Sequence, residues 1–280
     1  MLEFGEITDG IQPCELDISL LYSDPDDRAR FERNWPEYLR SDPSLTQVVR
    51  RAGNKIFYIT ESLIPAERDN RPPLLLLLGN PAPHSVAAGM CFAFEGSGRE
   101  HRFWVALRRA GLLEFSSDSH TRAYTLEERN RIRKQELFRL DYTSPFRIGI
   151  AVYFSLPSAA SDPKWSGVSG LHRLFGARAL HLIAARENER ISDLVRGVMD
   201  RPGGILAFQR AAYEGVRSES TPPYTRALAR SGRLLGQARY GTHVLLAGAP
   251  PTRLLNSATD LQSLAGCGEH LAVSLEAMSA

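Results

Sequence analysis

Four short apolar runs, each bounded by turn-forming residues, do most to limit how this chain of 280 residues can fold. A run of about five apolar residues between Pro, Gly or Asn is typical of a strand buried on both faces, as in a parallel sheet. The runs are residues 74–78, 147–154, 205–208 and 243–247, and helical periodicity lies between them. The pattern predicts an α/β fold, a three-layer α/β/α sandwich around a central four-stranded parallel sheet.

Helices are expected between and after these strands. Their ranges are 100–110, 124–140, 171–199 (with a break near Gly176 or Asn188) and 211–216. The helix at 124–140 alternates acids and bases, which predicts a solvated helix, with contact to a phosphate backbone as the alternative. Residues 1–72 mix acidic turns with short helical stretches and end in a polar segment before Pro73. We expect residues 1–72 to be an N-terminal extension packed on the core, and residues 73–280 to be the main domain.

Composition narrows the class of protein. A hydrophobic fraction of 43% and a charged fraction of 24% exclude a disordered, collagen-like or coiled-coil chain. The longest apolar run is far shorter than the roughly 20 residues of a membrane helix, and the acidic residues 1–10 contain no signal peptide. The three cysteines, Cys14, Cys91 and Cys267, are too far apart for a CxxC pair. We expect a reduced, cytoplasmic, monomeric protein with no cofactor, no metal and no membrane partner.

The basic residues are almost all arginine. Only three of the 34 Lys and Arg residues are lysines, and residues 196–253 hold nine arginines against three acids. Arginine presents a fork of donors that suits phosphate, so this excess favours a nucleic-acid partner. The alternative is an arginine-rich protein with solvated helix faces, and charge does not decide between them.

The loop at residues 79–85 is the strongest candidate for chemistry. In an open α/β sheet the site lies at the carboxyl ends of the strands, and this loop, Gly79-Asn80-Pro81-Ala82-Pro83-His84-Ser85, follows the first one. Two prolines restrict its backbone. The carbonyl of Asn80 can orient a water molecule, although Asn is no general base. The alternative is an Asn-Pro turn whose side chain only satisfies nearby backbone groups.

This loop begins a series of residues at fixed spacing. The series is Gly79-Asn80-Pro81, Ser85, Gly89, Phe92-Ala93, Arg102-Phe103-Trp104 and Ala110-Gly111-Leu112. It resembles the first motif of the uracil-DNA glycosylase superfamily, nearest to the mismatch-specific uracil/thymine branch, which reads roughly G-I-N-P-G-x-x-S, G-x-x-F-A, N-R-F-W and A-G-hydrophobic. Residues 205–214 resemble the family's third strand and following helix, and residues 249–256 fall where its second motif belongs. The resemblance covers about residues 73–257.

The resemblance implies a monofunctional DNA glycosylase, a DNA-repair hydrolase that cleaves the bond between base and deoxyribose and leaves an abasic site. Asn80 would position the water and Phe92 would stack on the extruded base, while groups from Gly79 to Ser85, Pro81 among them, would line the base pocket. The loop with Pro250, Pro251, Thr252 and Arg253 would contact DNA by pressing into the minor groove. Base flipping costs a few kcal/mol. Stacking on an aromatic ring recovers about 1–3 kcal/mol of this cost.

Two departures from the family pattern affect base recognition. Ala249-Pro250-Pro251-Thr252 replaces the usual His-Pro-Ser or Asn-Pro-Ser, so the donor to the pyrimidine carbonyl is missing or is supplied by Thr252 or Arg253. Ser155 stands where the family often has an Asn that reads the uracil edge, and one hydroxyl cannot reproduce its two hydrogen bonds. Gln209 is the candidate substitute, with a surface amide near a helix start as the alternative.

Ala82 stands where the strict uracil enzymes have a Tyr, which leaves the pocket open at carbon 5 of the pyrimidine. We therefore expect tolerance of thymine, or of a hydroxymethylated or glucosylated cytosine from phage DNA, as in an anti-phage (antiviral defence) glycosylase. Cytosine-type bases leave poorly unless protonated, and His84 is the candidate to assist. A hydrogen-bonded structural histidine is the alternative.

The sequence allows three functions to be compared. The leading one is a DNA glycosylase for a modified or mismatched base, acting on duplex DNA with an extruded base or on single-stranded DNA. The second is a catalytically altered nucleic-acid-binding protein of the same fold. The third, an unrelated α/β hydrolase acting on a nucleoside, lacks support because the chain has no G-x-S-x-G elbow.

Overall fold

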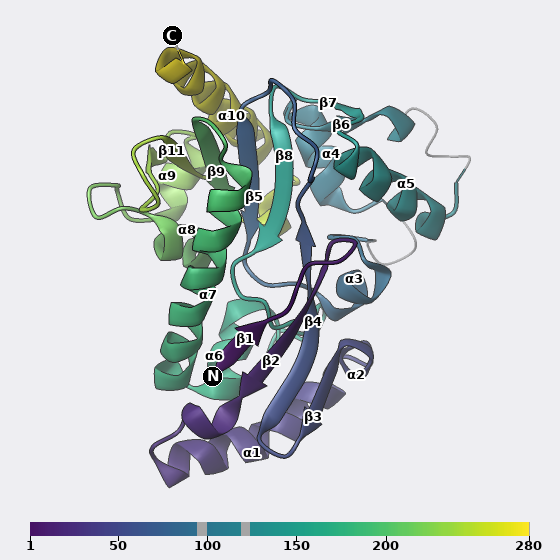
Figure 1. Cartoon of the computed structure of the whole chain (residues 1–280), viewed down its shortest axis with the longest axis vertical. Helices are drawn as coiled ribbons and strands as arrows, with labels where there is room; N and C mark the ends of the chain where they lie inside the picture. The colour runs from purple at the N-terminus through teal and green to yellow at the C-terminus, as the bar shows by residue number, and fades with distance from the viewer. Residues whose placement is uncertain (94–99, 119–123, 280) are drawn as a thin grey trace. The chain divides into compact units, whose positions relative to one another are not determined.

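The computed structural model describes residues 1–93, 100–118 and 124–279 (Figure 1). The chain divides into two compact units, each assembled from three stretches of sequence. The first contains Met1–Ser62, Gly79–Cys91 and Val152–Ile191, and the second contains Leu63–Leu78, Phe92–Ala151 and Ser192–Ala280. This division cuts across the boundary expected between residues 72 and 73, because the N-terminal strands share a unit with two later stretches of the chain.

The first unit is built on an antiparallel sheet. Strand β2 pairs with β1 on one side and β4 on the other, and β3 pairs with the opposite edge of β4. The elements of this unit are β1 (Leu2–Phe4), β2 (Ile11–Asp17), η1 (Ile18–Leu20), α1 (Pro25–Arg40), α2 (Leu45–Val48), β3 (Val49–Ala52), β4 (Lys55–Leu63), α3 (Pro83–Ala88), α6 (Gly167–Phe175) and the first part of α7 (Ala177–Val198). The apolar segment at 56–59 is thus the middle of a nine-residue strand.

Helix α1 is longer than the short helical stretches expected before residue 73. The residues at its N-terminus and along its buried face explain this length. The Asp24 side chain accepts the N–H of Asp26, and Pro25 occupies the first turn, both of which favour a helix start. Phe31, Trp35 and Tyr38 are buried at helical spacing. The Phe31 ring stacks on Phe175 of α6 with 5.6 Å between centroids, so this aromatic stripe holds α1 against α6.

The second unit contains a mixed, mostly parallel sheet in the order β8-β5-β9-β11-β10. The α/β class is therefore confirmed. Strands β5, β9 and β11 are parallel, and β10 is antiparallel to β11. The elements of this unit are β5 (Pro73–Leu78), α4 (Arg102–Arg109), β6 (Glu114–Phe115), α5 (Leu126–Phe138), β7 (Tyr142–Thr143), β8 (Arg147–Val152), β9 (Gly203–Ala207), α8 (Arg210–Val216), α9 (Arg226–Arg230), β10 (Leu235–Gln237), β11 (Val244–Gly248), η4 (Thr252–Leu254) and α10 (Ala258–Ser279).

All four predicted strands are present in this sheet, but the purely parallel sheet is wrong. Strand β10 is three residues long and centred on a glycine, so its sequence has no strand pattern to detect. Helices α10 and α8 lie on opposite faces, because a Cβ on Gly204 would contact Leu271 of α10 at 3.2 Å, whereas one on Gly248 would contact Tyr213 of α8 at 3.1 Å. The register pairs Gly248 with Ala207, which points to the other face from Gly204.

The expected helices are largely confirmed. The break in the helix at 171–199 occurs at Gly176, which has a φ of +81° and separates α6 from α7. Helix α10 was not predicted, although Leu264, Cys267, Leu271 and Leu275 bury one stripe of it. Within the described ranges, no helix has both the length and the apolar character that crossing a membrane requires.

The expectation of a solvated helix at 124–140 is wrong for one face of α5. Arg133 is only 1% exposed and forms ion pairs with Glu100 and Asp118, the latter also accepting from the Arg133 Nε at 3.1 Å. The guanidinium lies 5.8 Å from the Trp104 ring centroid and 5.5 Å from that of Phe115. One of the charged residues of this helix thus forms a buried ion pair. Because the Arg133 side chain is buried, it cannot contact a phosphate backbone.

Replacing Arg133 with methionine is expected to lower the free energy of unfolding by about 2 kcal/mol, because the buried Asp118 carboxylate then keeps only its ion pair with Arg108, at 3.0 Å. Denaturant unfolding measures this change. Arg131→Met is the matched control, since Arg131 is exposed on the same helix and its replacement is expected to cost less than about 0.5 kcal/mol. Equal stability of the two variants would contradict the buried ion pair.

Candidate functional site

The turn at Asn80 is fixed by the segment that follows β8, and all of these residues belong to the first unit. The Phe154 N–H donates to the Gly79 carbonyl at 2.8 Å, and the Ser158 N–H donates to the Pro81 carbonyl at 3.1 Å. Gly79 and Pro81 are buried, whereas Asn80 between them is partly exposed. Backbone bonds on both sides of Asn80 therefore hold its Cα in place.

The Asn80 side chain is also held. Its Nδ2 donates to the Ser158 Oγ at 2.7 Å, and that oxygen accepts the Gly167 N–H at 2.8 Å. Ser158 is 3% exposed, so the acceptor is part of the interior. No described residue donates to Asn80 Oδ1. The structure thus presents an oriented carbonyl oxygen with its acceptor capacity unused, on a side chain that solvent reaches.

Helix α3 begins immediately after this turn. Ala82 is its N-cap residue, and Pro83 occupies the first turn. The Ser85 N–H donates to the Ala82 carbonyl at 3.0 Å, and Ser85 is buried. Ala82 is partly exposed and carries only a methyl group, so its side chain fills little space beside Asn80.

His84 lies on the first turn of α3 and is half-buried. Burial lowers its pKa below the ordinary value, and the negative charge of Asp42 opposes the shift only in part. A histidine with a lowered pKa is mostly neutral at pH 7 and is a weak source of protons. The structure therefore gives little support to His84 as an acid that protonates a departing base.

Ser155 is fully buried, and its hydroxyl is engaged in an internal network. Glu187 accepts both the Ser155 N–H at 2.6 Å and its Oγ at 2.5 Å, and the Tyr58 hydroxyl lies 2.7 Å from the same Oγ. Arg190 donates its Nε to Glu187 at 2.8 Å. Ser155 is 0% exposed and its one hydroxyl proton is bonded to Glu187, so it is not available to donate to a base, which corrects its expected place in a base pocket.

Phe92 belongs to the second unit, where it is part of an aromatic cluster. Its ring centroid lies 4.3 Å from that of Phe103 and 4.5 Å from that of His101. Its backbone has a φ of +52°, and its carbonyl accepts the Trp104 Nε1–H at 3.1 Å. The strained conformation turns a half-buried ring onto Phe103, so only the part of the ring that these neighbours leave uncovered can meet a base.

Gln209 follows β9 in the second unit. The residue before it, Phe208, belongs to the same aromatic cluster, because its ring packs edge-on against Phe103 with 5.4 Å between centroids. Gln209 is the N-cap residue of α8, but its side chain makes no capping bond. No described residue bonds to its amide. A partly exposed amide without a partner keeps donors and acceptors available for a ligand.

The loop at 250–253 follows β11 and runs into η4. The Ala249 N–H donates to the Ala207 carbonyl at 2.9 Å, which places the ends of β11 and β9 side by side. Pro250 is buried, Pro251 and Thr252 are partly exposed, and Arg253 is exposed. Arg253 makes no ion pair with any carboxylate in the described ranges.

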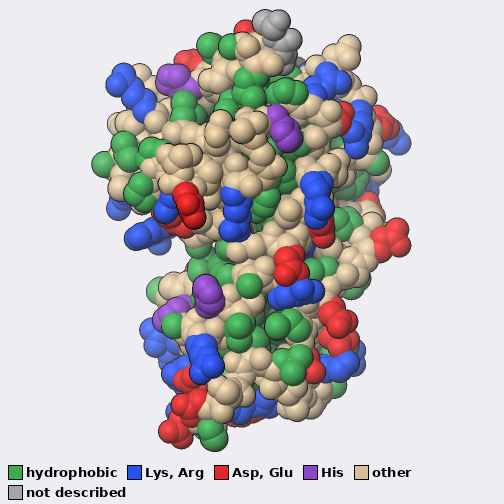
Figure 2. Space-filling model, turned by 60° about the vertical axis from the view of Figure 1, so that its left-hand side comes forward, with side chains coloured by type: hydrophobic (Ala, Val, Ile, Leu, Met, Phe, Trp, Pro, Cys, Tyr) green, Lys and Arg blue, Asp and Glu red, His purple; other side chains and the backbone are tan. Residues whose placement is uncertain are grey.

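The exposed arginines of the second unit come from several separate segments of the chain. Several arginines of the second unit are exposed and lack an ion pair among the described residues: Arg210, Arg226, Arg233 and Arg253. On the face shown in Figure 2, Lys and Arg side chains lie singly or beside acidic ones. Surface charge alone therefore does not identify a nucleic-acid interface.

Sequence reasoning missed Ser158, which holds Asn80. It lies in the loop after the second predicted strand, where a site residue is expected, but a serine in a loop has no distinguishing signal. Across the described residues, no group of three or more His, Cys, Asp or Glu side chains is placed to hold a metal ion. In comparisons with known proteins, neither a family model nor a curated protein matched this chain.

Proposed function

We propose that this protein is a DNA glycosylase that hydrolyses the bond between a pyrimidine base and deoxyribose. One observation carries the proposal: the Asn80 amide is held through its Nδ2 by buried Ser158, and its Oδ1 has no partner among the described residues. An oriented acceptor on a proline-restricted turn is suited to aligning a water molecule.

The fold gives further support. In the strand order β8-β5-β9-β11, β5 has β8 as its neighbour on one side and β9 on the other. The connections that follow β5 in the chain therefore lead first to one side of this strand and then to the other. Ligands of open α/β sheets bind at the carboxyl ends of the strands beside such a switch point. The Asn80 turn follows β5 directly. We extend the proposal to the fold: β5, β8, β9 and β11 would form the four-stranded core of a uracil-DNA-glycosylase-like domain.

The proposed chemistry needs no general base. The bond from C1′ to the base nitrogen breaks with its electron pair going to the base, and the sugar gains oxocarbenium character. The water oxygen forms the new bond to C1′, and the water's proton replaces the sugar on the base nitrogen. Asn80 aligns the water without deprotonating it, which suffices because the cationic sugar is a strong electrophile. Misplacement of a reacting group by about 1 Å can cost about 100-fold in rate, so alignment of the water matters.

The residues around Asn80 favour a particular set of bases. Because Ala82 carries only a methyl group, it would leave room at carbon 5 of a pyrimidine bound beside Asn80, and the proposal therefore includes thymine as well as uracil. His84, with its lowered pKa, favours bases that leave as anions over cytosine-type bases that must be protonated. We therefore propose uracil and mismatched thymine ahead of modified cytosines, in DNA repair ahead of antiviral defence.

The test is base release from a panel of DNA strands that contain uracil, a G:T mismatch, hypoxanthine, hydroxymethylcytosine or its glucosylated form, followed by alkaline cleavage of abasic sites. We expect strand breaks with uracil or the G:T mismatch. Binding to all strands with no break in any would overturn the proposal and identify a nucleic-acid-binding protein that has lost the chemistry.

Ser158→Ala is expected to slow base release about 10-fold, because the Asn80 amide then rotates freely and the water loses its alignment. One lost hydrogen bond is expected to cost only about 1 kcal/mol of stability. Single-turnover rates and denaturant unfolding measure the two effects. Ser161→Ala, an exposed serine in the same loop, is the control, and a Ser158→Ala rate equal to that control would contradict the positioning role.

A further inference from the structure

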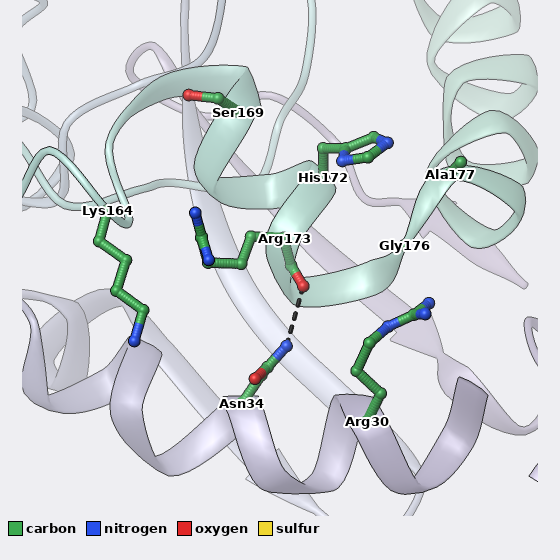
Figure 3. Close-up of a pocket in the computed structure, with 8 residues that line it drawn as sticks. All are labelled: Arg30, Asn34, Lys164, Ser169, His172, Arg173, Gly176 and Ala177. Carbon is green, nitrogen blue, oxygen red and sulfur yellow. Dashed lines mark hydrogen bonds between the residues drawn. The ribbon is translucent and has the colours of Figure 1, made fainter. Parts of the chain in front are cut away.

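We propose that the groove between α1, α6 and the start of α7 binds a phosphate group, at a site separate from the Asn80 turn. The groove belongs entirely to the first unit and has a volume of about 830 Å³. Six of its lining side chains are polar or basic: Arg30, Asn34, Lys164, Ser169, His172 and Arg173. Figure 3 shows that they come from α1, from α6 and from the segment before α6.

No carboxylate lines the groove. Asp27 pairs with Arg30 at 2.9 Å, and Glu37 pairs with Lys164, but all four of these side chains are substantially exposed. Exposed ion pairs contribute little, so a ligand can compete for both cations. Arg173 is exposed and makes no ion pair with any residue that the structure describes. Arg30 and Lys164 each have an exposed carboxylate partner, so among the described residues the positive charge at the groove that has no such partner is that of Arg173.

The backbone adds to this positive charge. Helix α7 is 22 residues long and begins at Ala177, on the groove wall. The first N–H groups of a helix have no partner within it and carry a partial positive charge. The Arg30 guanidinium lies against the residue just before this helix, since a Cβ on Gly176 would come within 1.9 Å of Arg30 Nη2. Arg30 has Asp27 as an exposed ion-pair partner, and a phosphate bound here would be shared between the Arg30 guanidinium and the first N–H groups of α7.

The basic side chains have a second possible role, because His172 and Arg173 lie in the last turn of α6, where positive charge stabilises a helix end. Uncharged side chains already donate hydrogen bonds to the carbonyl groups at the C-terminal end of α6. Asn34 Nδ2 donates to the Arg173 carbonyl at 2.9 Å, as Figure 3 shows, and the Tyr22 hydroxyl donates to the Phe175 carbonyl at 3.2 Å. Capping of α6 thus does not account for Arg30 and Lys164, which approach from outside the helix.

The groove is larger than one phosphate needs. Its volume is within the range of small-molecule sites, and it is open to solvent, so it can take a nucleotide-sized phosphate ester or one phosphate of a DNA strand. The recognition chemistry is the same in both cases, with forked Arg donors and helix N–H groups around phosphate oxygens. This inference does not depend on the glycosylase activity.

The experiment measures binding of pyrophosphate, of AMP and of a 12-residue single-stranded oligodeoxynucleotide by calorimetry in about 50 mM salt. The proteins compared are the full chain, Arg173→Gln, Arg30→Gln with Arg173→Gln, and Arg33→Gln as a control. Arg33 is exposed on α1 and is not part of the groove. We expect Arg173→Gln to weaken binding about 10-fold, the double variant to abolish binding of the small anions, and Arg33→Gln to leave it unchanged.

The three probes distinguish a small phosphate compound from a backbone phosphate of DNA. If pyrophosphate or AMP binds and Arg173→Gln weakens that binding, the ligand is a small phosphate compound. If only the oligonucleotide is affected, and its salt slope falls by about one, the ligand is a backbone phosphate of DNA. No binding of any probe, or equal affinity in Arg173→Gln and the full chain, would overturn the proposal. Base release by the Arg173→Gln variant reports separately on the glycosylase proposal.

Discussion

Asn80→Ala is expected to lower the single-turnover rate of base release at least about 100-fold relative to the unchanged protein, because the water loses its alignment. The variant removes the side-chain carbonyl oxygen that Ser158 orients and that has no donor among the described residues. Affinity for DNA is expected to change less than about threefold, because a partly exposed amide contributes little binding energy of its own. Rates measured with enzyme in excess separate these effects.

Asn80→Asp is the matched control for this experiment. An aspartate keeps an acceptor oxygen toward the water, and its second oxygen accepts a hydrogen bond from the Ser158 hydroxyl in place of the lost amide donor. We expect it to retain most of the activity. Full activity in Asn80→Ala would defeat the mechanism, and an Asn80→Asp variant as inactive as Asn80→Ala would contradict the acceptor role.

Glu61→Gln is expected to stabilise the folded protein at pH 8 by about 3 kcal/mol. Glu61 of β4 is 1% exposed, and its Oε1 has no hydrogen-bond partner among the described residues. Burial raises the pKa of Glu61 from 4.5 to about 7, and a hydrogen bond from the Cys91 thiol to Oε2, at 3.1 Å, opposes that shift only weakly. Each pKa unit corresponds to about 1.4 kcal/mol.

The direction of the pH dependence follows from where the proton is held. Below pH 4.5 the carboxyl is protonated in both states, and its neutral form stabilises the fold fully. Between pH 4.5 and about 7 the unfolded chain releases the proton while the folded chain keeps it, so stability falls as pH rises through this window. Above about pH 7 the carboxyl is ionised in the folded and the unfolded chain, and the stability that its neutral form contributed is lost in full.

Denaturant unfolding at pH 5 and pH 8 measures this effect. The unchanged protein is expected to lose stability relative to Glu61→Gln between the two pH values, whereas Glu127→Gln, an exposed control on α5, is expected to follow the unchanged protein. A constant difference between Glu61→Gln and the unchanged protein across this range would contradict a buried carboxyl that is neutral in the fold.

The strands of the second unit could be predicted because burial on both faces imposes a strong pattern. Leu74–Leu78 has no polar position, and its bounding turn residues define its ends, so β5 was found almost to the residue. The Asn80 turn was found for a similar local reason, since two prolines and a strand end mark it in the sequence. Both signals depend on residues that are adjacent in the chain.

The features that sequence did not reveal depend on contacts between distant segments. Arg133 belongs to a helix with charges on all sides, and only the folded chain brings Asp118 and Glu100 to it. Ser155 followed a predicted strand, yet its role is set by Glu187, a residue in the middle of α7. The first unit was underestimated because its half-buried antiparallel strands alternate polar and apolar residues, a weaker signal than a continuous apolar run.

Identification of the products by mass spectrometry tests the central proposal most directly. The full-length protein is incubated with duplex DNA that contains one uracil or one G:T mismatch, and the mixture is analysed without alkali. The account predicts free uracil or thymine in a one-to-one ratio with an intact strand that carries an abasic deoxyribose. Recovery of both strands unchanged, or of a base still attached to its sugar, would contradict it.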